Sequence, residues 1–508
     1  MARVKTDVLV IGSGFGAAAP ALRLAHAGLR VTLIEKGPRI DPFKDFRQTS
    51  DPQYLLRYLK GLAGEHLAVT YAEALGGGSG FYEMVSLRAP SLAFDQTDGV
   101  GRRLWPAGVD RAALDPYYDM AEAMLHVTQI PFEQVPKTGQ VFAMMMKNLG
   151  YSCDRARYAE RGCVGSGFCV TGCIYAAKQS LLLNYLPQAV AAGATIETDL
   201  EALEVRTLLP VQRTARGGRL SKVPYRYEVR CRHRERPGDV VVYQTRVLVL
   251  AGGTVGTAAL LLRSGEHLRF LGPHVGRNIV FNGSVKAAGL LPESFPDGDM
   301  FTGRTHPGMI SYQFLESHGI TVSAVKAMPL QLLAGTRLRM DGDPRKPAWW
   351  GEANVDLMKR CRRRLIALYA IGLTPPAGRV VLTPGGAPSV ELDPDPPLQA
   401  YYDRTAAVLR SILRDSGCRI VEAHAVDRGG SPREGPFFST AHQAGSCRMA
   451  DTKAHGVVDA AGEAFDYPGL YVTDGSVIPS SLAVNTSLTI LANAERIAAG
   501  IARRYRAS

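Results

Sequence analysis

A glycine-rich turn between two apolar strands carries the clearest chemical signal in this sequence. The apolar run from Val8 leads into Gly12, Gly14 and Gly16, and Glu35 ends the next apolar strand, Val31 to Ile34. Glycines at such a turn let the backbone touch a pyrophosphate, and the helix that follows points free N–H groups and a partial positive charge at it. A carboxylate about twenty residues further on binds ribose hydroxyls. The spacing predicts a site for the ADP half of a dinucleotide, and therefore redox chemistry.

The turn departs from the usual pattern in two ways. Ala17 occupies the third glycine position, and Pro20 falls within the helical run expected over 17–27. Proline is tolerated in the first turn of a helix, where its missing N–H has no partner, so we place Pro20 there. The alternative interpretation of these residues is a strand, turn and helix that bind nothing.

Two later parts of the chain supply elements of the same kind. A second flexible glycine segment, Leu75 to Gly80, lets the backbone approach a large cofactor closely. A buried strand is expected over 247–250, followed by an apolar helix over 257–262, and an apolar strand over 470–473 leads into Asp474. We expect these three separated segments to return to one α/β sheet.

The cysteines allow two interpretations. Three of the eight cluster as Cys163, Cys169 and Cys173, whereas a ferredoxin-like run would read C-x2-C-x2-C-x3-C and here Ser166 stands at the second position. Three thiolates are enough to hold an iron–sulfur cluster. A packed loop of small residues explains the same pattern without a metal.

Seven ordered motifs cover nearly the whole chain. They are GSGFGAA near the start, LGGGSG from Leu75, AGGTVGTAALLL from Ala251, VGRN from Val275, HQAGSCRM from His442, GLYVTDGSVIPSS from Gly469 and VNTSLTILANAERIA from Val484. Through them the sequence resembles the glucose-methanol-choline (GMC) oxidoreductase family, and within it cholesterol oxidases and bacterial long-chain alcohol oxidases most. The resemblance implies an α/β fold, with a discontinuous Rossmann-like FAD-binding domain and a substrate domain built on a mostly antiparallel sheet with helices.

Domain boundaries follow from where the motifs lie. We expect the FAD-binding domain to consist of residues 1–95, 160–285 and 430–508, and the substrate domain of residues 96–159 and 286–429. Within the latter, residues 379–382 and 390–392 are expected to be strands joined by a turn at 384–386.

The resemblance also implies which residues bind FAD. Gly12, Ser13, Gly14, Phe15 and Gly16 would lie on the pyrophosphate, Glu35 on the adenosine ribose, Gly76, Gly77, Gly78, Ser79, Asp474 and Gly475 near the ribityl and phosphate parts, and Asn485 and Thr486 at the flavin. Some relatives attach FAD through a histidine in the glycine loop. Residues 75–90 contain no histidine, so we expect FAD to be held noncovalently.

His442 and Asn485 match the two catalytic positions of the family. The resemblance implies that His442 takes the proton of an alcohol hydroxyl while the hydride passes to flavin N5, and that Asn485 orients the substrate oxygen. A neutral imidazole suits this role at neutral pH. The alternative is that His442 caps a buried turn and Asn485 caps a helix.

The expected substrate is a primary or secondary alcohol, with a bulky, hydrophobic or sterol body. Large flexible side chains in the middle segment suit such a body, namely Met300, Met309, Met328 and Met340. Cholesterol oxidases also use a glutamate in the substrate domain, but neither Glu316 nor Glu352 matches a family motif. The electron acceptor would be O2, a quinone or an acceptor protein.

Two other activities remain open within the same family. One is a sugar-type dehydrogenase that passes electrons from FAD through the iron–sulfur cluster to a quinone or cytochrome, because similar cysteine spacing occurs in GMC glucose dehydrogenases. The other is a lyase that retains its flavin without net electron transfer.

Charge and composition exclude several classes. The 508 residues carry a net charge of +12, but much of the excess lies on 225–234, whose alternation of apolar and charged residues predicts a half-buried antiparallel strand. No nucleic-acid motif accompanies the charge.

The longest uncharged stretch, 247–262, is shorter than the ~20 residues of a membrane helix. The first strand begins too early for a signal peptide. We expect a cytoplasmic protein; membrane-surface docking by the basic run 359–364, after Trp349 and Trp350, is the alternative to a solvated face.

Overall fold

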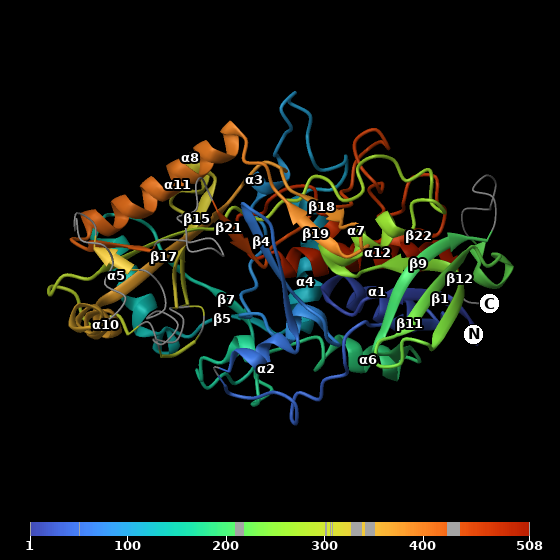
Figure 1. Ribbon diagram of the computed structural model, residues 1–508, viewed down its shortest axis with the longest axis horizontal. Helices are drawn as coiled ribbons and strands as arrows, with labels where there is room; N and C mark the ends of the chain where they lie inside the picture. Colours follow the sequence, from blue (N-terminus) through green and yellow to red (C-terminus); the bar gives the residue numbers. More distant parts are fainter. Residues whose placement is uncertain are drawn as a thin grey trace.

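The computed structural model describes residues 2–49, 51–208, 218–299, 302–304, 306, 308–326, 338–340, 351–423 and 437–506. Two large sheets organise these residues at opposite ends of the molecule (Figure 1). The end that carries both chain termini holds the strands of the predicted dinucleotide-binding fold, and the other end holds an antiparallel sheet backed by helices.

The first sheet has seven strands in a mixed arrangement. Its order is β8 (Thr195–Glu197), β2 (Val31–Ile34), β1 (Ala2–Ile11), β12 (Val240–Leu250), β11 (Tyr227–His233) and β9 (Leu200–Thr207), with β22 (Leu470–Val472) also paired to β12. The pairs from β8 to β12, and β12 with β22, are parallel, whereas β11 and β9 run antiparallel. Residues Val8 to Val10 are fully buried, as expected for a strand covered on both faces. Strands from the start, middle and end of the chain thus meet in one sheet, as the sequence predicted.

Four helices pack around this sheet, and their ends define the turns that follow its strands. They are α1 (Phe15–His26), α6 (Tyr185–Ala191), α7 (Gly253–Arg263) and α12 (Ser487–Arg504). Helices α1 and α12 pack together, and Arg23 of α1 binds the fully buried Glu495 of α12 through two hydrogen bonds of 2.7 and 2.8 Å. Tyr185 at the start of α6 donates a third hydrogen bond to Glu495 (2.7 Å). One buried carboxylate therefore joins all three helices.

The expectation that Pro20 lies in the first helical turn is wrong. Helix α1 begins at Phe15, so Pro20 lies in its interior and provides no N–H for the carbonyl of Gly16. The hydroxyl of Thr473 donates to that carbonyl instead (Oγ1 to O, 2.8 Å). A side chain from the last part of the chain thus satisfies the acceptor that the proline leaves open.

The second large sheet is antiparallel throughout, as predicted. Its order is β16 (Leu338–Met340), β20 (Arg419–Ala423), β13 (Val285–Leu290), β17 (Leu365–Gly372), β15 (Ile320–Val325), β14 (Met309–Ser311) and β6 (Asp154–Arg155). Helix α11 (Pro396–Asp415) packs on β13, α5 (Lys137–Asn148) on β15, and α10 (Glu352–Arg364) on β13 and β17.

Smaller elements complete the described part of the fold. They include α2 (Pro52–Leu56), β3 (Leu59–Ala63), β4 (Leu67–Ala72), α3 (Ser91–Phe94), α4 (Arg111–Met124), β5 (Val127–Gln129), β7 (Arg157–Ala159), β10 (Gly218–Arg219), α8 (Leu315–His318), β21 (Phe438–Thr440) and β23 (Tyr505–Arg506). The predicted hairpin is present as β18 (Arg379–Leu382) and β19 (Pro388–Glu391), a separate two-stranded sheet that packs on α7 rather than joining the antiparallel sheet. The domain boundaries stay a prediction. Within the described part of the chain, no helix is both long enough and apolar enough to span a bilayer.

Candidate active site

The first glycine turn packs closely against two other segments, the glycine loop 75–80 and the segment that follows β22. A Cβ added to Gly16 would lie 2.4 Å from Cα of Asp474, and one on Gly77 would lie 2.9 Å from Cα of Gly14. Side chains at these positions would therefore push the segments apart, which is why the close approach requires glycine. The turn, the glycine loop 75–80 and the segment after β22 therefore lie against one another, and they are the segments that the sequence assigns to the cofactor.

Ser13 links this turn to the predicted ribose carboxylate. Its hydroxyl donates to Oε2 of Glu35 (2.5 Å) and accepts a hydrogen bond from the N–H of Gly76 (3.0 Å). The N–H of Gly37 donates to the other carboxylate oxygen of Glu35 (2.7 Å). Burial raises the pKa of Glu35 to about 7, although both of these hydrogen bonds act to lower it. Ser13 thus fixes the acid against the glycine loop.

Asp474 is an anchor for the backbone around it. Its buried carboxylate accepts hydrogen bonds from the N–H of Gly253 (2.7 Å), the hydroxyl of Thr257 (2.5 Å), and the N–H and hydroxyl of Ser476 (2.8 and 2.5 Å). Burial raises the pKa of Asp474, and these donors oppose that effect. The carboxylate therefore joins α7 to the 474–477 turn, and Gly475 presents backbone beside it.

Two helix N-termini suit an anionic cofactor. Helix α1 starts at the N-cap Gly14 and α12 at the N-cap Thr486; neither has a side-chain cap or an acidic residue in its first turn. The first N–H groups of a helix have no partner within it and carry partial positive charge. Together with the open backbone at Gly78, where an added Cβ would meet nothing within 4 Å, these ends fit a bound FAD.

His442 and Asn485 meet although 43 positions separate them. Nδ2 of Asn485 lies 3.0 Å from Nε2 of His442, and both side chains are half-buried. An amide nitrogen is a donor only, so Nε2 holds the lone pair and the ring is the Nδ1–H tautomer. The helix N-cap is Thr486, so Asn485 is not the cap that the alternative interpretation required.

Burial determines the protonation state of the histidine. It lowers the pKa of His442 to about 4, because a charged imidazolium would lose its hydration there. The ring is therefore neutral at pH 7. Its backbone N–H donates to the hydroxyl of Thr440 at the end of β21 (2.8 Å), which fixes the turn that carries it. A neutral, oriented imidazole beside a carboxamide is able to accept a proton from a hydroxyl group.

The sequence did not indicate how the loop that carries Asn485 is held. Asn282 accepts from the N–H of Leu482 (2.7 Å) and donates to the carbonyl of Val484 (2.7 Å), while the hydroxyl of Thr321 donates to the carbonyl of Ala483 (2.6 Å). Thr321 belongs to β15, so the antiparallel sheet contacts this loop directly. Neither residue lies within a recognisable motif, and only the fold brings them here.

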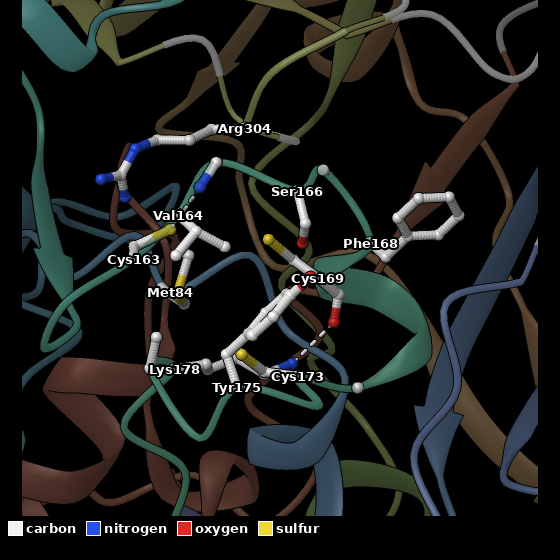
Figure 2. Close-up of a pocket in the computed structure, with 14 residues that line it drawn as sticks. Met84, Cys163, Val164, Ser166, Phe168, Cys169, Cys173, Tyr175, Lys178 and Arg304 are labelled. Carbon is white, nitrogen blue, oxygen red and sulfur yellow. Dashed lines mark hydrogen bonds between the residues drawn. The ribbon is translucent and has the colours of Figure 1, made fainter.

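The cysteine segment forms a pocket-lining loop. Figure 2 shows Cys163, Cys169 and Cys173 around a pocket that Lys178 and Arg304 also line. Across the described ranges, no group of three or more His, Cys, Asp or Glu side chains is arranged to hold a metal ion. Burial raises the pKa of the free Cys163 thiol to about 11. The described residues therefore give no support to the iron–sulfur interpretation.

Lys178 attaches this loop to the glycine loop. Its buried ammonium donates to the carbonyls of Gly80 (2.5 Å), Cys169 (2.6 Å) and Tyr82 (3.4 Å). Burial lowers the pKa of Lys178 to about 8. The cysteine loop thus supports the backbone of the glycine loop, a role that its spacing did not reveal.

Comparison with known families agrees with this architecture. The GMC oxidoreductase model for the N-terminal part matches residues 6–282, and the model for the C-terminal part matches residues 407–494. The chain belongs to the GMC oxidoreductase family. It is therefore an enzyme of that type, and family membership implies FAD as its cofactor. The two matched segments include the glycine turn, Glu35, His442 and Asn485.

Individual relatives of this GMC protein are distant. A long-chain-alcohol oxidase of Arabidopsis thaliana is 26% identical over 98% of this chain and 67% of its own length. A cholesterol oxidase of Mycobacterium tuberculosis is 26% identical over 97% and 90%, and a paromamine 6'-oxidase of Streptomyces fradiae is 26% identical over 98% and 91%. The formate oxidase of Aspergillus oryzae shares the fold, with a TM-score of 0.67 and 13% identity over 99% of this chain and 98% of that one.

Proposed function

We propose that this GMC protein oxidises a primary or secondary alcohol to the carbonyl compound, with His442 as the base and noncovalent FAD as the hydride acceptor. The observation that carries the proposal is the contact between Nε2 of His442 and Nδ2 of Asn485 at 3.0 Å. It brings a proton acceptor and a hydrogen-bond donor to one point between the two sheets. FAD, when bound, supplies the acceptor of two electrons.

Residues of the chain itself accept the proton and orient the alcohol. An alcohol oxygen within reach of both groups donates its proton to Nε2 and accepts a hydrogen bond from the Asn485 amide. The carbon that bears it is then ready to lose a hydride. Helix α12 begins just after Asn485, and its positive end stabilises negative charge in front of it. The residues that we assign to FAD are the fourteen positions expected from the sequence, from Gly12 to Thr486.

The proposed alcohol oxidation does not by itself specify the size or polarity of the substrate. The relatives named above are oxidases of a long-chain alcohol, cholesterol and paromamine, so their names do not select one class. The bulky, hydrophobic or sterol body expected from the sequence rested on the resemblance to cholesterol oxidases and long-chain alcohol oxidases, with four methionines as a second indication. Met309 is buried in β14, and Met300, Met328 and the side chain of Met340 lie outside the described residues.

We also infer that the protein works in the cytoplasm. In the part of the chain that the structure describes, the eight cysteines form no disulfide, as is usual for a reducing compartment. The basic run on α10 favours the solvated face over membrane docking, because Arg363 and Arg364 pair with Asp297. Trp349 and Trp350 lie outside the described residues.

The experiment is anaerobic mixing of the FAD-loaded enzyme with a panel of alcohols. Loss of the oxidised flavin absorbance would support the proposal, and its recovery in air or with an added quinone would identify the acceptor. A flavin-retaining lyase would leave the absorbance unchanged with every alcohol. Replacement of His442 by alanine should slow the bleaching by about 10²- to 10⁴-fold, the usual contribution of a general base, without loss of bound FAD. An unchanged rate would exclude His442 as the base.

A further inference from the structure

Basic side chains from three separate segments meet at the turn around His455. The segments are the hairpin 97–103, the turn 274–277 that follows α7, and residues 448–456. The last of them is closed by a hydrogen bond from the N–H of His455 to the carbonyl of Thr452 (3.0 Å). Four basic residues that are distant in the sequence thus form one patch, which we call the basic cluster: Arg102, His274, Arg448 and His455.

Hydrogen bonds orient the members of the basic cluster toward this turn. Nε of Arg448 donates to the carbonyl of His455 (2.7 Å), and Nε2 of His274 donates to the carbonyl of Ala454 (2.8 Å). Nη1 of Arg102 contacts Nε2 of the His455 ring. A guanidinium is a donor only, so Nε2 of His455 holds the lone pair and Nδ1 carries the hydrogen. Both guanidinium groups therefore contact the same residue, His455.

Carboxylates compensate only part of the positive charge on these segments. Arg102 binds Asp98 through Nε and Nη2 (3.0 and 2.6 Å), and Lys453 binds Asp466 (2.5 Å). Asp451 accepts a hydrogen bond from a backbone N–H (2.8 Å), and it has no ion pair with a described cation. Two of the cations are thus paired, and one carboxylate is left for the others.

Three further cations have no carboxylate partner among the described residues. Arg103 donates to two backbone carbonyls (3.0 Å each). Arg277 is exposed, and its backbone N–H donates to the carbonyl of His274 (3.1 Å), which places it beside the basic cluster. Arg448 is half-buried, and in the described part of the chain its two Nη groups have no hydrogen-bond partner. With Asp451 counted against these three, the segments carry an excess of two positive charges.

Arg448 is the least favourably placed of these cations. A half-buried charge loses part of its hydration, and without a counter-charge nothing replaces the loss. Burial and the neighbouring Arg102 both lower the pKa of Arg448. A bound anion would therefore stabilise this turn, because it would supply the missing negative charge.

We propose that Arg102, Arg448 and His455 bind a phosphate group, either of free phosphate or of a phosphate ester. The free Nη groups of Arg448 and the Nδ1–H of His455 are donors from different directions, and Arg102 adds charge beside them. A phosphate dianion offers two negative charges and several acceptor oxygens, which matches both the charge excess and these donors. A carboxylate offers one charge and two oxygens. The proposal concerns a second site and does not depend on the alcohol chemistry at His442.

The experiment is calorimetric titration of the FAD-loaded enzyme with inorganic phosphate and with glycerol 3-phosphate, at an ionic strength kept constant with NaCl. We expect a Kd below ~1 mM for at least one probe, and the tighter probe distinguishes free phosphate from an ester. Acetate, the control with a single charge, should bind at least about 10-fold more weakly. No binding of either probe up to ~10 mM, or equal affinity for acetate, would overturn the proposal.

Variants locate the bound phosphate. Arg448→Gln and Arg102→Gln should each weaken binding of the preferred probe by about 10-fold or more, because each removes a cation from the site. Arg362→Gln removes the same charge from an exposed position on α10 and is the matched control, with an expected change of less than about 2-fold. FAD content and the visible spectrum report folding. Because Arg102 is exposed, Arg102→Gln tests the site even if Arg448→Gln fails to fold. Unchanged affinity in the folded site variants would place the phosphate elsewhere and contradict the proposal.

Discussion

At the residue scale, the protonation state of His442 is set by its surroundings more than by its partner. Asn485 donates a neutral hydrogen bond to Nε2, and burial lowers the pKa of the ring to about 4. The imidazole is therefore neutral across the whole neutral range, and its one lone pair lies on Nε2, where it accepts from Asn485. An alcohol hydroxyl has to replace this contact in order to donate to Nε2.

This leads to a prediction about pH. The base is active when neutral, so the proposed activity is present above the pKa of His442 and is lost as the pH falls through about 4. A kcat/KM profile measured from pH 3.5 to 8 should be flat with respect to this group above pH ~5. A histidine with an ordinary pKa would instead cause the activity to fall between pH ~7 and 6. That result would contradict the burial seen here.

At the element scale, α1 depends on a residue from the far end of the chain. Pro20 leaves the carbonyl of Gly16 without its helical donor, and Thr473 replaces that donor with a hydroxyl (2.8 Å). The same contact holds the glycine turn against the start of the Asp474 segment. A proline in a helix interior is thus tolerated because a β22 neighbour supplies a hydrogen bond.

A double-mutant cycle tests this dependence. Thr473→Val should reduce the free energy of unfolding by about 1–3 kcal/mol, because it leaves a buried carbonyl unpaired. In a Pro20→Ala background the alanine N–H bonds to the same carbonyl, and the loss should shrink by at least half. Chemical denaturation of the four proteins measures the coupling. Purely additive losses would show that Thr473 does not compensate for the proline.

At the scale of the whole molecule, the two large sheets meet at the loop before α12. Asn282 and Thr321 both bind this loop, and Thr321 comes from the antiparallel sheet. Any shift of that sheet therefore moves the backbone beside Asn485. The geometry of the proposed site depends on the packing of both sheets and not on one of them.

Thr321→Val removes this link while keeping the shape of the side chain. We expect kcat/KM for the alcohol to fall about 10-fold, since small displacements of reacting groups are costly. The affinity for FAD should fall less than kcat/KM, because only Asn485 and Thr486 among the residues assigned to FAD lie next to the backbone that Thr321 holds. Thr321→Ser keeps the hydroxyl and should restore most of the activity. A parallel loss of FAD in titrations would show instead that the mutation disturbs the whole fold.

The sequence by itself determined the features that depend on neighbouring residues. The glycine turn after Val8, the alternation over 225–234 and the hairpin 379–392 follow from local spacing and backbone sterics, and all are present in the structure. The family motifs also indicated His442 and Asn485 as partners. Their roles in catalysis remain a proposal.

Only the tertiary structure decided which distant groups come together. It brought Asn485 to His442 and Thr473 to Gly16. Among the residues that the structure describes, Cys163, Cys169 and Cys173 are not arranged as a metal-ligand set, although their spacing resembles one. Sequence spacing fixes the direction of a side chain within a helix or strand but not within a glycine-rich loop. There the packing of remote segments decides it.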